Sequence, residues 1–329
     1  MSNTLLAPAQ WAQSEFALAG LGDQRRTQRL VNIAASLAQS PGGTLPQAFP
    51  EWQDLKAASR FFNQPQAGPE PIQTPHWERT RARGREPGEY LLIEDTSELD
   101  YSGHPATEEL GPIGNGRGRG FLLHSTLALS VAGWALAQRP EGIVVGLFAQ
   151  QCWTRRGSPK RGRETWRKRS KRRRESQRWA EVFEQMGGPP PGRQWVFIAD
   201  READFYEPIE RCQRHGVDFV IRGYRDRRLA EPADYLKAAV AQMPVRGRME
   251  VALRARPGQA ARVATVEVRS GTVRARGPER PGGDKPDFTV NVVEVREVHA
   301  PAGAQALHWL LLTSLPCVRW AEVRRIVTR

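Results

Sequence analysis

Residues 90–95 read YLLIED and residues 195–200 read WVFIAD, and these two stretches decide the fold. Each is a short apolar run that ends in an aspartate, a pattern typical of a buried strand in an α/β protein. Ligands of an open α/β sheet gather outside the carboxyl ends of its strands. The pattern therefore predicts a sheet with Asp95 and Asp200 together at one edge.

Two converging carboxylates form a site of hard oxygen ligands that suits Mg²⁺ or Mn²⁺. Two such ions can bracket a phosphodiester, one activating the attacking oxygen and the other stabilising the leaving oxygen. An aspartate after a strand also commonly caps a turn or a helix. From these residues alone, both interpretations of Asp95 and Asp200 stay open.

The patterns on either side of these strands divide the chain into four segments. Residues 1–75 are predicted to be helical, with helices over 23–39 and 51–62, and GPEP at 68–71 is predicted to be a linker. Residues 76–224 alternate strands with helices. Residues 225–305 form short alternating stretches separated by Gly and Pro, which indicates a mostly β insertion. Residues 306–329 hold a last strand, 308–313, and the start of a helix.

The chain is strongly basic, with a net charge of +13 and a pI near 10.4 over 329 residues. This balance favours an anionic partner, with nucleic acid ahead of a membrane surface, although an ordinary protein from an Arg-rich genome stays possible. The three cysteines have no ligand-like spacing, so we expect neither disulfides nor a zinc site. The N-terminus does not resemble a signal peptide, and residues 121–137 are too polar to span a membrane. We expect a cytoplasmic protein.

Most of the excess charge lies in one segment, residues 155–178, which holds 13 Lys or Arg and two acids. Its densest part contains Arg172, Arg173 and Arg174. Such a segment can neutralise several phosphates and bind DNA with a steep salt dependence. The alternative is a solvated loop that never contacts DNA, because dense like charge disfavours compact structure.

Longer motifs resemble a known family. The stretches IEDTSELDYSG, EELGPIGNGRGRGFLLHSTLALS, ADREADFYEPI, DFVIRGYRDR and HWLLLTSLP, in this order, are similar to the insertion-sequence-4 family of DDE transposases. The N-terminal LGDQRRTQRLVNIAASLAQSPGGTLPQAF and AASRFFNQP resemble that family's helical end-binding domain. The similarity covers nearly the whole chain. It implies a ribonuclease-H-like mixed-sheet core, a helical DNA-binding domain and a β-rich insertion.

The resemblance also implies roles for single residues. Asp95 and Asp200 match the first and second catalytic carboxylates, which hold Mg²⁺ or Mn²⁺, two ions when DNA is bound. Arg222 matches an arginine that contacts DNA near the cleavage site. Trp309 matches a tryptophan that fills the space left by a flipped base, although from the residues alone a core tryptophan is the simpler interpretation. The arginines that match the DNA contacts of the end-binding domain are Arg25, Arg26 and Arg29.

The chain departs from the family's pattern at its C-terminus. The family's third carboxylate belongs to a helical signature, Y-x-x-R-x-x-x-E-x-x-x-x-x-x-K, and no counterpart follows EVRRIVTR before Arg329. Glu322 falls about two to three turns too early to replace it, and Glu202 is on the wrong element. We therefore expect a truncated chain that also lacks the family's C-terminal dimer contacts.

Two functions of different classes follow from these expectations. The first is DNA transposition and recombination, in which the chain binds double-stranded transposon ends and target DNA, cleaves strands and transfers them. The second is a catalytically defective chain that only binds DNA and acts as an inhibitor of an intact relative. A stand-alone nuclease is a weaker third. The end sequence, the target preference and the oligomeric state are not predicted.

Overall fold

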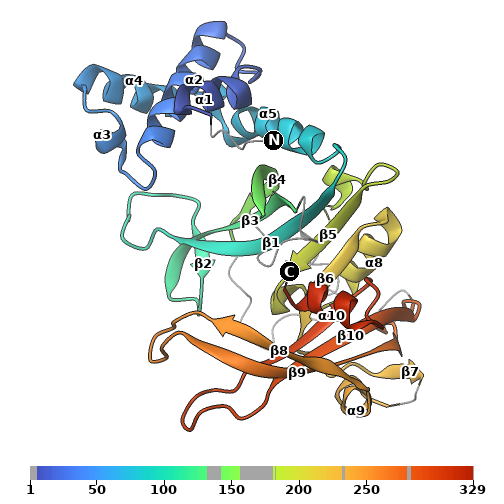
Figure 1. Ribbon diagram of the computed structural model, residues 1–329. Helices are drawn as coiled ribbons and strands as arrows, with labels where there is room; N and C mark the ends of the chain where they lie inside the picture. The colour runs from blue at the N-terminus through green and yellow to red at the C-terminus, as the bar shows by residue number, and fades with distance from the viewer. Residues whose placement is uncertain are drawn as a thin grey trace. The chain divides into compact units, whose positions relative to one another are not determined.

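The computed structural model describes residues 6–131, 142–155, 181, 183–231, 234–279 and 283–328. By its internal contacts the chain forms two compact units. The first comprises Met1–Glu86 with Val145–Phe148, and the second comprises Pro87–Val144 with Ala149–Arg329. Figure 1 shows helices in the first unit and a large sheet in the second.

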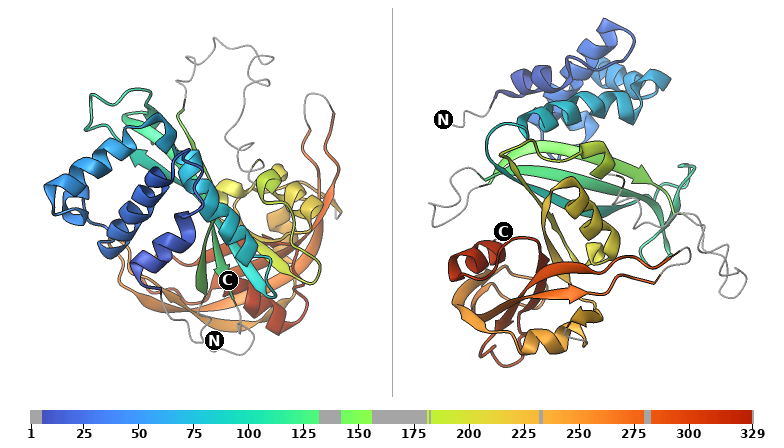
Figure 2. Two further views of the ribbon diagram at one scale, coloured as in Figure 1. Left: turned by 90° about the horizontal axis from the view of Figure 1, so that it is seen from above. Right: turned by 90° about the vertical axis from the view of Figure 1, so that its right-hand side faces the viewer.

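The first unit is built from helices, and Figure 2 shows them in two further directions. Their bounds are α1 Pro8–Phe16, α2 Gln24–Gln39, α3 Leu45–Ala48, α4 Trp52–Phe62 and α5 Pro69–Arg83, with a 3₁₀ turn, η1, at Pro65–Ala67. The expected helices at 23–39 and 51–62 are thus confirmed as α2 and α4. The expected linker at 68–71 is wrong, because Pro69 begins α5. Proline suits the first turn of a helix, where its missing N–H has no partner to lose.

The core of this unit follows from the helical periodicity of the sequence. Leu30 and Ile33 of α2 lie on one face and are buried against Phe49 and against Ala58 and Phe61 of α4. Asp23 begins α2 as its N-cap, because its Oδ1 accepts the backbone N–H of Arg25 at 2.7 Å. One buried aromatic, Phe61, is 2% exposed and anchors this cluster.

A buried carboxylate joins α1 to α5 in the same unit. Glu15 is 2% exposed, and its two oxygens accept hydrogen bonds from His76 at 2.8 Å and from Arg83 at 2.6 Å. Burial by itself raises the pKa of Glu15, but the bonds from His76 and Arg83 outweigh it and hold that pKa below its ordinary value. The stability that Glu15 contributes is therefore present at neutral pH and is lost as the pH falls through its lowered pKa.

Within the described residues, and apart from residues 145–148 of β4, the second unit is an eleven-stranded mixed sheet with the order β2-β3-β1-β5-β6-β11-β10-β9-β7, to which β4 adds on β3 and β8 on β9. The strands of the N-terminal half are β1 Glu89–Asp100, β2 Gly111–Ile113, β3 Gly118–Ser130, β4 Ile143–Trp153, β5 Gln194–Ala199 and β6 Asp218–Gly223. The strands of the C-terminal half are β7 Leu229–Glu231, β8 Val245–Leu253, β9 Arg262–Ala275, β10 Phe288–Glu297 and β11 His308–Thr313. The helices are α8 Tyr206–His215, α9 Leu236–Ala241 and α10 Trp320–Val327, with a 3₁₀ turn, η2, at Arg201–Ala203.

The three central strands, β1, β5 and β6, run parallel to one another. Apolar residues run without a break through 90–93 of β1, 195–199 of β5 and 219–221 of β6, as expected where both faces of a sheet are covered. On the other side of β1, β3 pairs antiparallel, and β11 pairs antiparallel with β6. The observed fold is thus a mixed α/β sheet preceded by helices.

One face of the central strands is covered by a distant part of the same sheet. Alternate residues of β8, namely Met249, Val251 and Leu253, pack in one apolar cluster with Ile93 of β1 and Ile198 of β5. The helix α10 adds its buried residues, Val323 and Ile326, to this cluster. The long β8–β9 hairpin therefore lies over the face on which the two predicted site aspartates are expected.

Several expectations need adjusting. The helix expected from residue 203 begins at Tyr206, after η2, and the segment expected to be mostly β also contains α9. The expected boundary at residue 75 lies inside α5, and the first unit ends at Glu86. The basic run, including Arg172, Arg173 and Arg174, lies outside the described residues except for Arg155, whose guanidinium pairs with Glu98.

Candidate functional site

The sheet register places Asp95 and Asp200 side by side. In the parallel pair of β1 and β5, Ile93 lies opposite Ile198 and Glu94 lies opposite Ala199, so the next position brings Asp95 opposite Asp200. Side chains two residues apart point to the same face of a strand, so both aspartates share the face of Ile93 and Ile198. The parallel ladder ends here, although β1 continues to Asp100 through its pairing with β3. Both aspartates are exposed.

Each aspartate uses one carboxylate oxygen locally. Oδ1 of Asp95 accepts the backbone N–H of Thr96 at 2.8 Å, and Oδ1 of Asp200 accepts the backbone N–H of Glu202 at 2.7 Å. The hydrogen bond that Asp200 accepts begins η2, so Asp200 caps a turn, which is one of the two interpretations of this residue. Within the described part of the chain the second oxygen of either carboxylate accepts no hydrogen bond, which leaves it available to a ligand.

Arg222 and Trp309 come to the same face from the neighbouring strands. Arg222 lies two residues after Val220, which belongs to the cluster under the site. In the antiparallel pair of β6 and β11, Leu311 lies opposite Arg222, and the guanidinium of Arg222 lies 5.9 Å from the centroid of the Trp309 ring. Trp309 is partly buried and packs against the apolar cluster of the sheet, as expected for a core tryptophan. Its ring also faces the guanidinium of Arg222.

Arg222 is held in an unusual environment for a cation. Its Nε is buried and has no hydrogen-bond partner among the residues that the structure describes. Burial lowers the pKa of Arg222, and the nearby cations Arg201 and Arg256 lower it further, while Asp200 opposes them. A half-buried guanidinium on the strand next to Asp200 is suited to bind an anion such as a phosphate.

One buried carboxylate beside the site was not predicted. Asp204 is 1% exposed, and its Oδ2 accepts the backbone N–H groups of Tyr224 and Arg225, each at 2.8 Å. Its Oδ1 accepts a hydrogen bond from the Arg227 guanidinium. Asp204 therefore ties the segment after Asp200 to the turn after Arg222. Its place as the second aspartate of DREAD is the signal in the sequence, but its burial is visible only in the structure.

A second unpredicted cluster lies behind Asp95. The side chains of Glu94 and His124 are fully buried, with Glu94 Oε2 3.1 Å from His124 Nε2. The other oxygen of Glu94 accepts a hydrogen bond from Thr126 at 2.8 Å, and Thr96 Oγ1 lies 2.9 Å from His124 Nδ1. Because side chains alternate along a strand, these groups occupy the face opposite to Asp95. They join β1 to β3 where β1 loses its pairing with β5.

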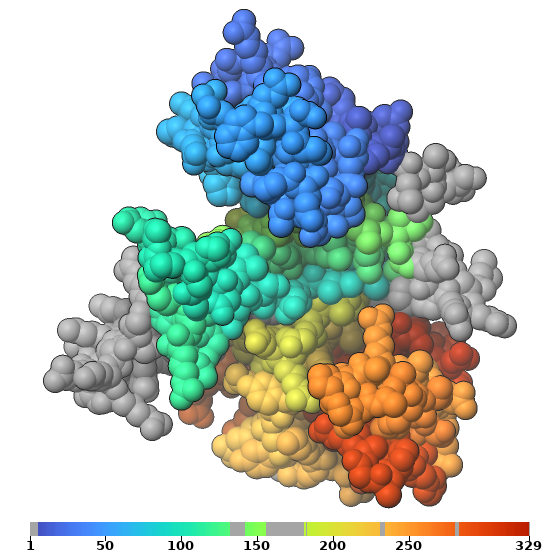
Figure 3. All heavy atoms as spheres, turned by 90° about the vertical axis from the view of Figure 1, so that its left-hand side faces the viewer, coloured from blue at the N-terminus to red at the C-terminus, as the bar shows by residue number. Residues whose placement is uncertain are grey.

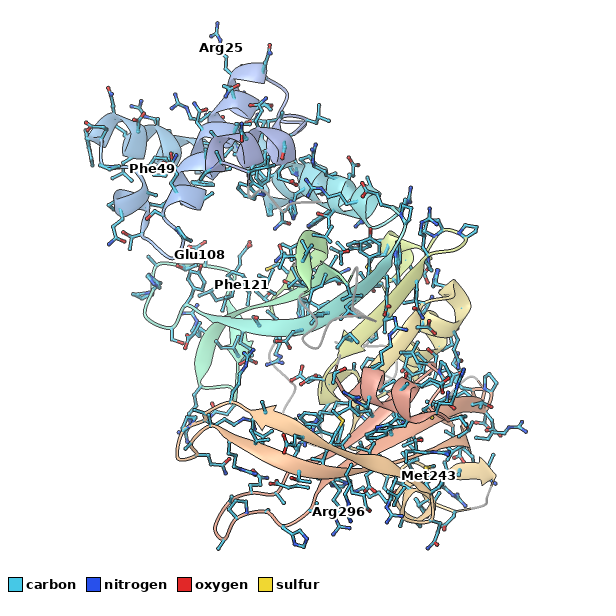
Figure 4. The ribbon with its side chains drawn as sticks, in the orientation of Figure 1. Arg25, Phe49, Glu108, Phe121, Met243 and Arg296 are labelled. Atoms are coloured by element: carbon cyan, nitrogen blue, oxygen red, sulfur yellow. The ribbon has the colours of Figure 1, made fainter. Side chains whose placement is uncertain are left out.

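The first unit carries the predicted DNA-contact arginines on α2. Arg25 and Arg29 are exposed and lie one turn apart, and Arg25 points away from the helical body in Figure 4. The first turn of α2 holds arginines and no acid, and the negative charge that the helix dipole favours at this end comes from the N-cap Asp23. Arg26 differs, because it is half-buried and its Nη1 donates to the carbonyl of Leu21 at 2.7 Å.

This difference separates the arginines experimentally. Arg26→Gln is expected to lower the free energy of unfolding of the first unit by about 1 kcal/mol, because the buried carbonyl of Leu21 loses its donor. Arg25→Gln is expected to leave stability unchanged and to weaken DNA binding. Urea denaturation and a filter-binding titration of each variant measure the two effects. Equal losses of stability would contradict the distinction.

One face of α4 carries basic and aromatic residues that the sequence analysis does not single out. Trp52, Lys56 and Arg60 are exposed and follow one another at a spacing of four residues, which places them on one side of the helix. Trp52 is 72% exposed, which is unusual for a large aromatic residue. Two cations and an exposed indole on one helix face suit phosphate contacts and apolar contact with a base or sugar. The spacing could have been read from the sequence, but the exposure could not.

Replacing both cations of α4 tests that face. The double variant Lys56→Gln, Arg60→Gln is expected to reduce the salt dependence of DNA binding by about two in the slope of log K against log salt, since each phosphate contact contributes about 0.9. The matched control exchanges the two residues, Lys56→Arg with Arg60→Lys, and keeps the charge. It should keep the slope. An unchanged slope in the glutamine variant would exclude α4 from the interface.

Glu322 and Glu202, the two acids weighed as a third metal ligand, have other roles or positions. Glu322 caps α10, since its Oε2 accepts the backbone N–H groups of Val318 at 3.1 Å and Arg319 at 2.9 Å. These bonds lower the pKa of Glu322 and keep its carboxylate at the start of the helix. Glu202 lies in η2 and is exposed. The described residues contain no group of three or more His, Cys, Asp or Glu side chains that could hold a metal ion.

The helices of the first unit match a known family. Residues 8–67, from the start of α1 to the end of η1, match the family model for a transposase DNA-binding domain. The match includes α2 with Arg25, Arg26 and Arg29, and α4 with the basic and aromatic face. The chain thus carries a transposase-related DNA-binding unit beside a large mixed sheet. In the described part of the chain no helix is long and apolar enough to cross a membrane.

Proposed function

We propose that this chain is a DNA transposase of the insertion-sequence-4 type, with a ribonuclease-H-like core in its second unit. The observation that carries the proposal is the register that brings Asp95 opposite Asp200, in a chain whose residues 8–67 match a transposase DNA-binding domain. The parallel strands β1, β5 and β6, flanked by antiparallel β3, support the assignment of the core. The substrate is double-stranded DNA.

The residues present fit a divalent metal ion. Asp95 and Asp200 each have an oxygen that accepts no hydrogen bond in the described residues, and carboxylate oxygens are the ligands that Mg²⁺ and Mn²⁺ prefer. A metal ion bound there polarises a phosphodiester and lowers the pKa of the attacking water. Arg222, which is half-buried on the strand next to Asp200, would hold a phosphate there through its guanidinium. Trp309 offers a planar face next to Arg222 for an unstacked nucleotide.

The second candidate function is DNA binding without cleavage. The family that the sequence resembles uses three carboxylates, whereas the sheet register brings two together at this edge. Such a chain would occupy DNA ends through α2 and α4 and would block an active relative. DNA binding by the first unit is expected for both candidate functions, so only a measurement of catalysis distinguishes them.

A strand-cleavage assay on DNA that carries the element ends, with Mn²⁺ and with Mg²⁺, tests the choice. Cleavage that disappears in Asp95→Ala, followed by joining of the released 3′ end to a target, supports the transposase. Binding without cleavage by the wild-type chain excludes catalysis and supports the second candidate. Cleavage without any joined product would indicate a nuclease instead.

A further inference from the structure

A row of polar side chains crosses the sheet at the level of Asp95. Ser125 of β3 lies directly opposite Asp95, and Nε2 of Gln150 on β4 donates to Ser125 Oγ at 2.9 Å. On the other side of β1, the parallel register brings Asp200 next to Asp95. Figure 3 shows the green β3 beside the blue-green β1 at the surface of the second unit, with the yellow-green β5 on the other side of β1. Four neighbouring strands thus each contribute one polar side chain to this row.

The row that precedes it on the same face is apolar. Two residues before Asp95, Ile93 lies between Ile198 of β5 and Leu127 of β3. Side chains two residues apart share a face of a strand, so the apolar row and the polar row lie on one face. The polar row comes directly after the last pair of the ladder between β1 and β5. Ser125 therefore belongs to the edge that carries the site aspartates, beyond the apolar core.

A buried network on the opposite face fixes Asp95 and Ser125 in this register. The residues on either side of these two form hydrogen bonds with one another across β1 and β3; they are Glu94, Thr96, His124 and Thr126. A slip by one residue would turn these buried groups to the other face and break their hydrogen bonds. The network thus holds Ser125 on the face of Asp95, with the two Cβ atoms about 5 Å apart, the usual spacing of directly opposite residues.

The hydroxyl of Ser125 is held in place and still has a proton to donate. A serine hydroxyl offers one donor and two acceptor lone pairs, and the amide of Gln150 occupies one lone pair. Among the described residues the O–H of Ser125 has no acceptor. Oδ2 of Asp95 likewise accepts no hydrogen bond there, because the N–H of Thr96 donates to Oδ1. An unused donor and an unused acceptor thus lie on neighbouring strands and on the same face.

We propose that Ser125 is a positioning residue of the metal site, and that its hydroxyl, oriented by Gln150, donates a hydrogen bond to the oxygen of Asp95 that binds the metal ion. Each carboxylate oxygen has two lone pairs, so one oxygen can hold the metal ion and accept this bond together. A hydrogen bond of this kind sets the orientation of a ligating carboxylate, and its loss typically weakens metal binding by about 10- to 100-fold. The proposal rests on the proposed function only in taking Asp95 as a metal ligand.

The test compares Ser125→Ala with Ser130→Ala in the full chain. Ser130 lies on the same strand but opposite Tyr90, at the other end of the pairing from Asp95. The probe is Mn²⁺ alone, and the fraction of free Mn²⁺ is read from its EPR signal, so the measurement does not depend on cleavage. Ser125→Thr keeps the hydroxyl, and Gln150→Met removes the donor that orients it. Urea denaturation shows whether each variant folds as the wild type does.

We expect Ser125→Ala to raise the Kd for Mn²⁺ by about 10- to 100-fold, and Gln150→Met to raise it by less. Ser125→Thr and Ser130→Ala should bind Mn²⁺ as the wild type does. Equal affinities of Ser125→Ala and Ser130→Ala would overturn the role of Ser125. A Ser125→Thr variant as weak as Ser125→Ala would assign the loss to packing and also overturn it. Should Ser125→Ala fail to fold, an unchanged affinity in Gln150→Met overturns the proposal.

Two further outcomes separate this proposal from the proposed function. Wild-type affinity for Mn²⁺ in Asp95→Asn would remove Asp95 from the metal site, and the role of Ser125 would be overturned with it. A wild-type chain that binds Mn²⁺, loses affinity in Ser125→Ala and never cleaves DNA refutes the proposed catalysis and supports the role of Ser125.

Discussion

Asp200→Asn, and separately Asp95→Asn, is expected to reduce metal-dependent strand cleavage by about 10³-fold while DNA affinity stays within about twofold of the wild type. The reduction corresponds to several kcal/mol of metal-ion stabilisation, at 1.36 kcal/mol for each factor of ten. Asparagine keeps the oxygen that accepts the N–H of Glu202 or Thr96, so the local turn is preserved. The measurement is single-turnover cleavage of end DNA, with affinity followed by fluorescence anisotropy.

The matched control is Asp226→Asn. Asp226 is an exposed aspartate that also accepts a backbone N–H, from Lys237 at 2.9 Å, and it lies in the turn after β6. Its replacement should leave the cleavage rate unchanged. A cleavage rate in Asp95→Asn and Asp200→Asn that equals that of Asp226→Asn would remove both residues from the metal site. An unchanged rate in only one of them would remove that one.

Glu94→Ala is expected to destabilise the second unit by about 3–5 kcal/mol, the range for removing one partner of a buried charged or polar pair. The substitution leaves the hydroxyl of Thr126 without its acceptor and the Nε2 of His124 without the carboxylate beside it. It also opens a cavity between β1 and β3 at the level of Asp95. Urea denaturation followed by tryptophan fluorescence measures the loss.

Glu98→Ala on the same strand is the matched control. Glu98 is exposed and pairs with Arg155 at the surface, an arrangement worth about 1 kcal/mol or less. A loss in Glu94→Ala no larger than that in Glu98→Ala would show that the buried network does not hold the two strands together. Double replacement of Glu94 and His124 by a well-packed apolar pair should recover part of the loss, because it removes the buried imidazole and fills the cavity, while the hydroxyl of Thr126 still lacks its acceptor.

Helical periodicity predicts α2 and α4 nearly to the residue, because their core positions, such as Leu30 and Ile33, recur with the period of a helix. The apolar runs before Asp95 and Asp200 likewise predict β1 and β5. The linker at 68–71 is the clearest failure. Its glycine and prolines are typical of loops, yet Pro69 is also a good first residue for α5, and the local signal does not distinguish the two.

The buried acids beside the candidate site could not be predicted from local sequence patterns. Asp204 and Glu94 are ordinary acids in the sequence, and their burial depends on Tyr224, Arg225 and Thr126, which lie 20 to 32 residues away along the chain. Met249 and Val251 of β8 approach Ile93 and Ile198 only through the fold of the sheet, which brings them into one apolar cluster. No spacing in the chain encodes that approach.

The sequence by itself determined the α/β class, the helical N-terminal unit and the two aspartates that follow apolar runs, because these are local patterns. It placed both at strand ends, whereas β1 continues past Asp95 to Asp100 through its pairing with β3. Only the tertiary structure decided that Asp95 and Asp200 are neighbours, since a parallel register is set by the packing of whole strands against each other. The same packing decided that Arg222 of β6 lies next to Asp200. Burial and register depend on residues distant in sequence, and for that reason the site became complete only in the folded chain.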